Sequence, residues 1–115
     1  MEADADVLES MMTGVQQLGP IELSGFRDFD AASMVVLKKI VGNYARKFTD
    51  HFNGFEKLCV SMKPVHQSQK ADHAVFELHC RVLAQGRVFA SHFSDRNVFL
   101  ALDKALKRVE AEVKV

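Results

Sequence analysis

The sequence predicts one α+β domain with the element order β-α-β-β-β-α, in which two roughly parallel helices pack on one face of a four-stranded mixed sheet. Three observations predict this fold. Two long stretches, residues 30–53 and 94–113, have apolar residues at helical spacing. Four shorter stretches alternate between apolar and polar residues, and glycine or proline marks their ends. Because alternating strands have one apolar face, both helices must bury their stripes on that face.

Residues 1–20 precede this domain as an acidic amphipathic segment, so we divide the chain into residues 1–20 and 21–115. The spacing predicts a short N-terminal amphipathic helix that ends at Gly19-Pro20. Gly14 weakens this pattern, and a frayed tail is the alternative. The apolar side chains of the segment, which could bind a partner, are Leu8, Met11, Met12, Val15 and Leu18.

The first strand is expected over residues 21–24, where Ile21 and Leu23 alternate with polar residues before Gly25. A long helix follows, with Asp30 as its expected N-cap and Asn53-Gly54 as its end. The apolar stripe of this helix consists of Met34, Leu37, Ile40, Val41, Tyr44 and Phe48.

Three more strands and a closing helix are expected in the second half of the chain. The strands are FEKLCVSMKP, HAVFELHCRVLA and RVFASHF, with Gln85-Gly86 as the turn between the last two. Ser94 is the expected N-cap of the closing helix. The first two strands, joined by a helix, should be parallel if they are neighbours, whereas the last three form a meander.

The composition is typical of a globular protein. Hydrophobic residues make up 48% of the chain and charged residues 26%, which argues against disorder. No apolar run approaches the ~20 residues needed to span a bilayer, and the acidic start does not resemble a signal peptide. We therefore expect a cytoplasmic protein without a membrane partner. Cys59 and Cys80 belong to no CxxC pair and are most simply apolar core residues, although the sequence leaves a disulfide open.

Opposite charges are concentrated in different parts of the chain, although the net charge is zero. Residues 1–30 hold seven acidic side chains and one basic side chain, a net charge of −6. Residues 31–115 hold fourteen basic and eight acidic side chains, a net charge of +6. This division is typical of an acidic tail beside a domain that binds a polyanion.

The two helices carry many of the basic residues. From Ala31 to Thr49 the first helix has four basic side chains and no acidic one. Lys39 and Arg46 lie opposite its apolar stripe, and Lys38 and Lys47 flank them. Side by side on one sheet, the helices would present a basic surface suited to phosphates, whereas a merely solvated face is the alternative. The candidate RNA-binding residues are Lys38, Lys39, Arg46, Lys47, Lys104, Lys107 and Arg108, with Arg96 and Arg87 as further candidates.

Catalytic and metal-binding patterns are not found in the sequence. The five histidines form no HExxH motif, and the glycines form no phosphate-binding loop. Nothing places a base and an orienting group beside Cys59, so this residue has no partners for nucleophilic catalysis. We expect no catalytic residue, no metal, no cofactor and no small-molecule substrate, and a binding protein rather than an enzyme.

Three stretches resemble the ribosome hibernation-promoting factor family, which includes ribosome-associated inhibitor A. They are IELSGF, LKKIVGNYARKFTDHFNGFEKLCVSMK and GRVFASHFSDRNVFLALDKALKRVE, and the resemblance covers about residues 21–113. It implies a protein that binds small-subunit ribosomal RNA near the decoding region and silences idle ribosomes. It also implies RNA contacts from basic residues of the two helices, at the positions given above.

The chain departs from that family in several ways. It is less basic than usual, and residues 1–20 have no counterpart in the short members. The turn SHFSDRN is about one residue longer than in common bacterial members, which favours a divergent branch, with an archaeal one as a candidate. The C-terminal dimerisation domain of the long members has no counterpart here, so ribosome pairing by that route is not expected.

The leading hypothesis is therefore a ribosome-associated translational silencer that binds ribosomal RNA and blocks messenger and transfer RNA sterically. The alternative is a protein–protein interaction module or homodimer that uses the N-terminal helix and binds no RNA.

Overall fold

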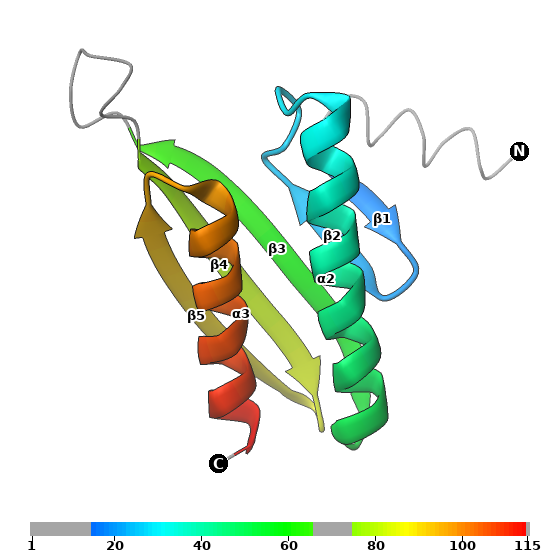
Figure 1. Cartoon of the computed structure of the whole chain (residues 1–115). Coiled ribbons are helices and arrows are strands. Elements are labelled where there is room, and N and C mark those ends of the chain that lie inside the picture. The colour runs from blue at the N-terminus through cyan, green and yellow to red at the C-terminus, as the bar shows by residue number, and fades with distance from the viewer. Residues whose placement is uncertain (1–14, 66–74, 115) are drawn as a thin grey trace, which may run out of the picture.

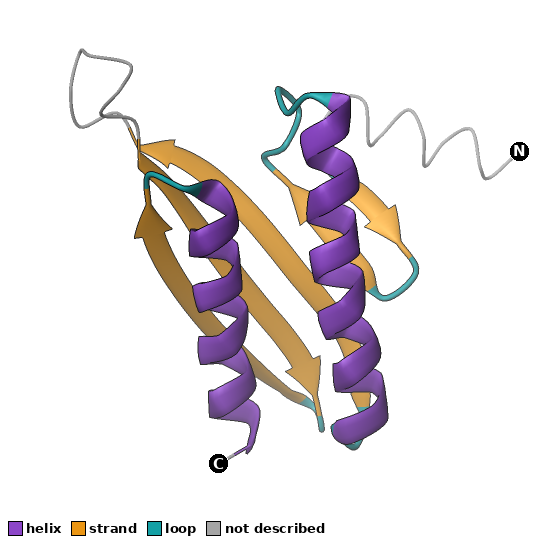
Figure 2. Cartoon of the chain, in the orientation of Figure 1, coloured by secondary structure: helices purple, strands orange, loops and turns teal. Residues whose placement is uncertain are grey.

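The computed structural model describes residues 15–65 and 75–114, which form one five-stranded sheet with two helices on the same face (Figures 1 and 2). The strands lie side by side in chain order. The elements are β1 (Gln16–Leu18), β2 (Ile21–Ser24), α2 (Ala31–His51), β3 (Phe55–Val65), β4 (Val75–Ala84), β5 (Arg87–Asp95) and α3 (Val98–Lys114). From Ile21 onward their order is the predicted β-α-β-β-β-α. None of the described helices is long and apolar enough to cross a bilayer.

The prediction of a four-stranded sheet preceded by a helix was wrong where the structure tests it. Residues Gln16–Leu18 form β1, which pairs antiparallel with β2 and places Leu18 opposite Ile21. Gly19, at φ +61°, and Pro20 reverse the chain between the two strands. Over Gln16–Leu18, pairing with the edge of β2 therefore takes the place of the predicted helix, and Val15 and Leu18 do not share a helical face. Leu8, Met11 and Met12 lie outside the described residues.

The first long helix follows its prediction closely. The Asp30 side chain accepts a hydrogen bond from Ser33 N–H at 2.6 Å, which confirms the N-cap. Leu37, Val41 and Phe48 are fully buried against the sheet, as the apolar stripe predicts. Gly25 positions the start of the helix, because its φ is +85° and a Cβ there would collide with the carbonyl group of Met62.

The sheet has the predicted pairing over β2 to β5. β2 and β3 are parallel, and β3, β4 and β5 form an antiparallel meander. Gln85 and Gly86 both have positive φ, 58° and 69°, as a two-residue hairpin turn requires. The helix-covered face of the central strands is lined by Leu58, Val60, Met62, Leu78, Cys80 and Val82, which are all buried.

The closing helix begins later than predicted. Ser94 pairs with Glu77 of β4 and belongs to β5, so its backbone is already committed to the sheet. Asn97 is the N-cap instead, because its Oδ1 accepts hydrogen bonds from Phe99 N–H at 3.0 Å and Leu100 N–H at 3.2 Å. Cys59 and Cys80 are both free and buried, which resolves the question of a disulfide. Burial raises the pKa of the Cys80 thiol to about 12, as expected for an inert core residue.

Candidate nucleic-acid interface

The exposed surface of α2 carries three basic residues that we call the α2 ridge: Lys38, Lys39 and Arg46. Leu37, Val41, Ala45 and Phe48 are buried toward the sheet, so at ~100° per residue Lys39 and Arg46 point away from it. Lys38 lies beside them, on the flank away from α3. All three side chains are exposed, and within the described residues none of them forms an ion pair. Among the described residues, no carboxylate therefore neutralises the α2 ridge.

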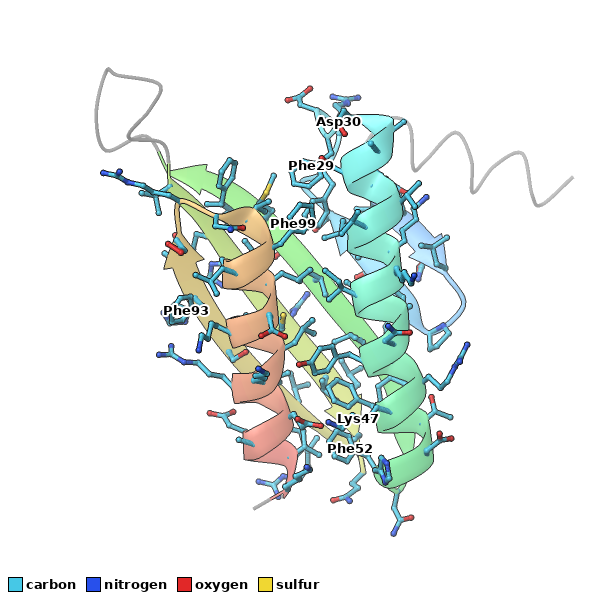
Figure 3. All side chains as sticks on the ribbon, in the orientation of Figure 1. Phe29, Asp30, Lys47, Phe52, Phe93 and Phe99 are labelled. Atoms are coloured by element: carbon cyan, nitrogen blue, oxygen red, sulfur yellow. The ribbon has the colours of Figure 1, made fainter. Side chains whose placement is uncertain are left out.

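The space between the two helices is a seam of mixed charge, which we define by Tyr44 and Lys47 of α2 and Asp103 and Glu110 of α3. Tyr44 Oη donates a hydrogen bond to Asp103 Oδ1 at 3.1 Å. Lys47 Nζ lies 2.7 Å from Glu110 Oε2 and 5.8 Å from the centre of the Tyr44 ring (Figure 3 labels Lys47). The expected basic surface of the two helices is thus interrupted between them by two carboxylates.

Lys47 has a structural role in this seam. The Glu110 side chain is only 12% exposed, and its Oε2 atom is buried with no well-aligned hydrogen bond from the described residues. The ammonium group of Lys47 is therefore the main compensation for that carboxylate, with Lys114 Nζ further away at 3.8 Å. Moving Lys47 onto a phosphate would leave the carboxylate without its closest cation.

The contacts within the seam change the pKa values of Tyr44 and Asp103 in opposite directions. Burial raises the pKa of Tyr44 to about 12, and the hydrogen bond and negative charge of Asp103 act in the same direction. Burial alone would raise the pKa of Asp103, but hydrogen bonds from Lys107 and Tyr44, together with the charges of Lys107 and Lys104, lower it. At neutral pH the seam therefore holds a neutral phenol and a charged carboxylate.

The outer side of α3 carries Lys104 and Lys107, which we call the α3 ridge. Both are exposed, but Lys107 Nζ lies 3.1 Å from Asp103 Oδ2, one helical turn earlier. Arg108 points elsewhere: its Nη1 donates to the carbonyl of His92 at 3.0 Å, and its guanidinium lies 4.9 Å from the centre of the Phe93 ring. Arg108 therefore covers the edge of β5, on the side of α3 away from α2 (Figure 3 labels Phe93).

The remaining two candidates lie at opposite ends of β5. Arg87 is at its start, next to the β4–β5 turn, with its guanidinium 5.3 Å from the centre of the Phe89 ring. Arg96 follows the other end of the strand, before α3 begins. The nine predicted residues thus do not form one surface: the α2 ridge and the α3 ridge lie on neighbouring helices on the same face of the sheet, with the seam between them.

The structure also places apolar side chains beside the ridges, which the sequence reasoning missed. Val35 of α2 is 68% exposed, Val36 is 44% exposed, and Leu100 of α3 is 43% exposed. The sequence run MVVL, residues 34–37, could have indicated exposed apolar residues on α2, because four consecutive apolar residues cannot all face one side of a helix. The helical face therefore combines cations with apolar contacts near the start of each helix.

Within the part of the chain that the structure describes, no three His, Cys, Asp or Glu side chains form a cluster that could hold a metal ion. His79 and His92 stack across β4 and β5 with ring centres 5.5 Å apart, and His79 Nε2 lies 2.6 Å from Glu77 Oε1. This pair lies on the face of the sheet that the helices leave uncovered, away from both ridges.

No protein-family model matches the chain, and no curated protein matches it either.

Proposed function

We propose that this protein is a ribosome-associated factor related to the hibernation-promoting family, which binds small-subunit ribosomal RNA near the decoding region and silences translation. The observation that carries the proposal is the α2 ridge, where three exposed cations lie on a helix without acidic residues from Ala31 to Thr49. The resemblance rests in part on the predicted order of elements, and the structure has that order from Ile21 onward, with two helices on one face. The protein would act in the cytoplasm, where ribosomes work.

Binding would rest mainly on phosphate contacts. Lys39 and Arg46 project from a helix whose opposite side is anchored in the core, so binding a folded RNA needs no ordering of the backbone, although both long side chains lose rotamer freedom. Each phosphate that the ridges neutralise releases counterions, which favours binding at low salt. Recognition would depend on the shape of the RNA backbone rather than on base sequence. Bound at the decoding region, the domain would exclude messenger and transfer RNA by its volume.

The seam narrows the proposed footprint. Lys47 is held by Glu110, and Arg108 lies over the edge of β5, so neither is a primary RNA contact in this proposal. The footprint consists of Lys38, Lys39, Arg46, Lys104 and Lys107, with exposed Val35, Val36 and Leu100 as neighbouring apolar contacts.

Co-sedimentation with purified small ribosomal subunits, at low and at high salt, tests the proposal. The α2-ridge variant is Lys39→Glu with Arg46→Glu. Its control is Lys63→Glu with Arg81→Glu, which changes the net charge equally at two exposed positions on the uncovered face of the sheet. We expect saturable binding that weakens with salt, is lost in the ridge variant and persists in the control. Equal binding by both variants would contradict the proposal.

A second candidate function is a protein–protein interaction module, favoured by the exposed apolar residues Val35, Val36 and Leu100. The two candidates separate in the same experiment. Binding that is insensitive to salt and to charge reversal, but lost in Val35→Ser with Leu100→Ser, would indicate a protein partner rather than RNA.

A further inference from the structure

β5 is an outer strand of the sheet, and within the described residues no strand pairs with its outer edge. It has nine residues, pairs with β4 without irregularity and contains no proline, glycine or lysine. Its charged residues are Arg87 and Asp95, one at each end. Natural sheets usually block such edges with lysine, proline, bulges or short strands, because an open edge pairs readily with another strand. The opposite edge is blocked in this way, since β1 has three residues and precedes Gly19-Pro20.

The geometry of the β4–β5 hairpin shows which backbone groups point outward. In a two-residue hairpin the residues that flank the turn, here Ala84 and Arg87, form a hydrogen-bonded pair, and such pairs alternate along the ladder. The N–H and C=O groups of Val88, Ala90, His92 and Ser94 therefore point away from β4. The hydrogen bond from Arg108 to the carbonyl of His92 agrees with this direction. The edge thus offers four residues with outward donors and acceptors.

We propose that two copies of this chain pair antiparallel along β5, with Ser91 opposite Ser91, to form one continuous ten-stranded sheet. In this register Arg87 lies opposite Asp95 of the second copy, and Phe89 lies opposite Phe93. The outward-pointing residues face one another, Val88 with Ser94 and Ala90 with His92, so their donors meet acceptors. A two-fold axis through Ser91 repeats every pair, as a closed dimer requires.

The side chains agree with the backbone register. Phe89 and Phe93 are both partly buried on the helix-covered face, so the cross-strand aromatic pairs would extend the existing core across the dimer axis. Arg87 and Asp95 lie on that same face by alternation, which places opposite charges together at both ends of the interface.

Other registers lose these matches. Pairing centred on Ala90 places Arg87 opposite Phe93 and Phe89 opposite Ser91. Pairing centred on His92 places Phe89 opposite Asp95 and leaves Arg87 beyond the partner strand. Only the Ser91 register, among these three, pairs Arg87 with Asp95 and Phe89 with Phe93 at both ends of the interface. The side chains of β5 therefore favour a second copy of β5 as the partner strand over an unrelated strand.

The dimer would be reversible. One strand pair is a small interface, so we expect dimers at high protein concentration and monomers on dilution. Arg108 need not leave the carbonyl of His92, because a carbonyl oxygen can accept two hydrogen bonds. The proposal is independent of the proposed function, since β5 lies on the far side of α3 from the α2 ridge.

Analytical ultracentrifugation of the full chain over a wide concentration range tests the proposal. We expect a monomer–dimer equilibrium. Ala90→Pro should weaken it at least tenfold, because proline removes an outward N–H that β4 does not use and so leaves the fold intact. Thermal unfolding of the variant checks that it is folded. A monomer at every concentration, or species that grow beyond a dimer, would overturn the proposal.

A charge-swap cycle tests the register and does not depend on the proline variant. Arg87→Asp and Asp95→Arg should each weaken dimerisation several-fold, because each places like charges opposite one another. The double variant should restore the dimer to within about twofold of the original. If the double variant is weaker than both single variants, the Ser91 register is wrong.

Discussion

On the α2 ridge, Lys39 and Arg46 point outward without an ion pair among the described residues, whereas in the seam Lys47 lies 2.7 Å from Glu110. Arg46 and Lys47 are neighbours in the chain and belong to the same helix. They differ because one points away from the sheet and the other toward α3. A cation that already pairs with a carboxylate must break that ion pair before it can bind an external phosphate, which costs free energy. The ion-pair partners of each basic residue therefore matter more for binding than the number of basic residues.

The largest expected effect is a difference between the two ridges. Lys39→Glu with Arg46→Glu should weaken binding to small ribosomal subunits roughly 100-fold, and Lys104→Glu with Lys107→Glu about tenfold. The α3 ridge should contribute less because Lys107 already pairs with Asp103 at 3.1 Å. Binding curves at several salt concentrations measure both effects. A larger loss in the α3-ridge variant would reverse the comparison.

The titration of Tyr44 should report the seam directly. The chain has one tyrosine and no tryptophan, so near-ultraviolet absorbance follows this side chain alone. We expect a midpoint near pH 12 in the folded protein and near pH 10.0 after unfolding. Because the folded pKa is the higher one, Tyr44 contributes its full stability below pH 10, and this contribution is lost as pH rises toward 12. Asp103→Asn should lower the folded midpoint, and an unchanged midpoint would show that the hydrogen bond does not matter.

A matched pair of alanine variants should separate structural from exposed cations by stability. Lys47→Ala should lower the free energy of unfolding by about 1–2 kcal/mol, because it leaves the nearly buried carboxylate of Glu110 without its closest cation. Arg46→Ala, one residue earlier, should change it by less than about 0.5 kcal/mol. Urea unfolding measures both. Equal effects would mean that Glu110 is compensated by other groups.

The smallest expected effect concerns the exposed pair on α3. Lys107→Ala should cost about 0.3 kcal/mol, because an exposed pair one turn apart is well screened by solvent. The pKa of Asp103 is lowered in the folded state, so its contribution is present above pH 3.8 and is lost as pH falls through the lowered value. As the pH falls through the pKa of Asp103, the free energy of unfolding should therefore fall less in Lys107→Ala than in the original chain. A large loss of stability at neutral pH would assign this pair a structural role.

The sequence predicted the features that local patterns encode. Alternation gave the four strands from Ile21 onward, helical periodicity gave the buried face of α2, and the N-cap at Asp30 followed from residue type. β1 was missed because a three-residue strand has no periodicity of its own and exists through pairing with β2. Ser94 was misassigned because the pairing of β5 with β4 continues past it.

The candidate site was predicted in part. The outward direction of Lys39 and Arg46 follows from periodicity alone, but the engagement of Lys47 depends on where Glu110 lies across the two helices. Asp103 and Glu110 lie within the stretch expected to form the closing helix, but the sequence pattern does not show that they face α2. Tyr44 carried a usable signal, because a phenol in an apolar stripe needs a hydrogen-bond partner.

The strand order also has a consequence for how the chain folds. β3, β4, β5 and α3 each pack against an element that is close in the sequence, whereas the parallel pairing of Ile21 with Leu58 must wait until α2 has closed a long loop. We therefore expect the meander and α3 to form the folding nucleus, and α2 and β2 to dock on it later. Core substitutions at Val82 or Leu106 should then slow folding, whereas Leu23→Ala should mainly speed unfolding.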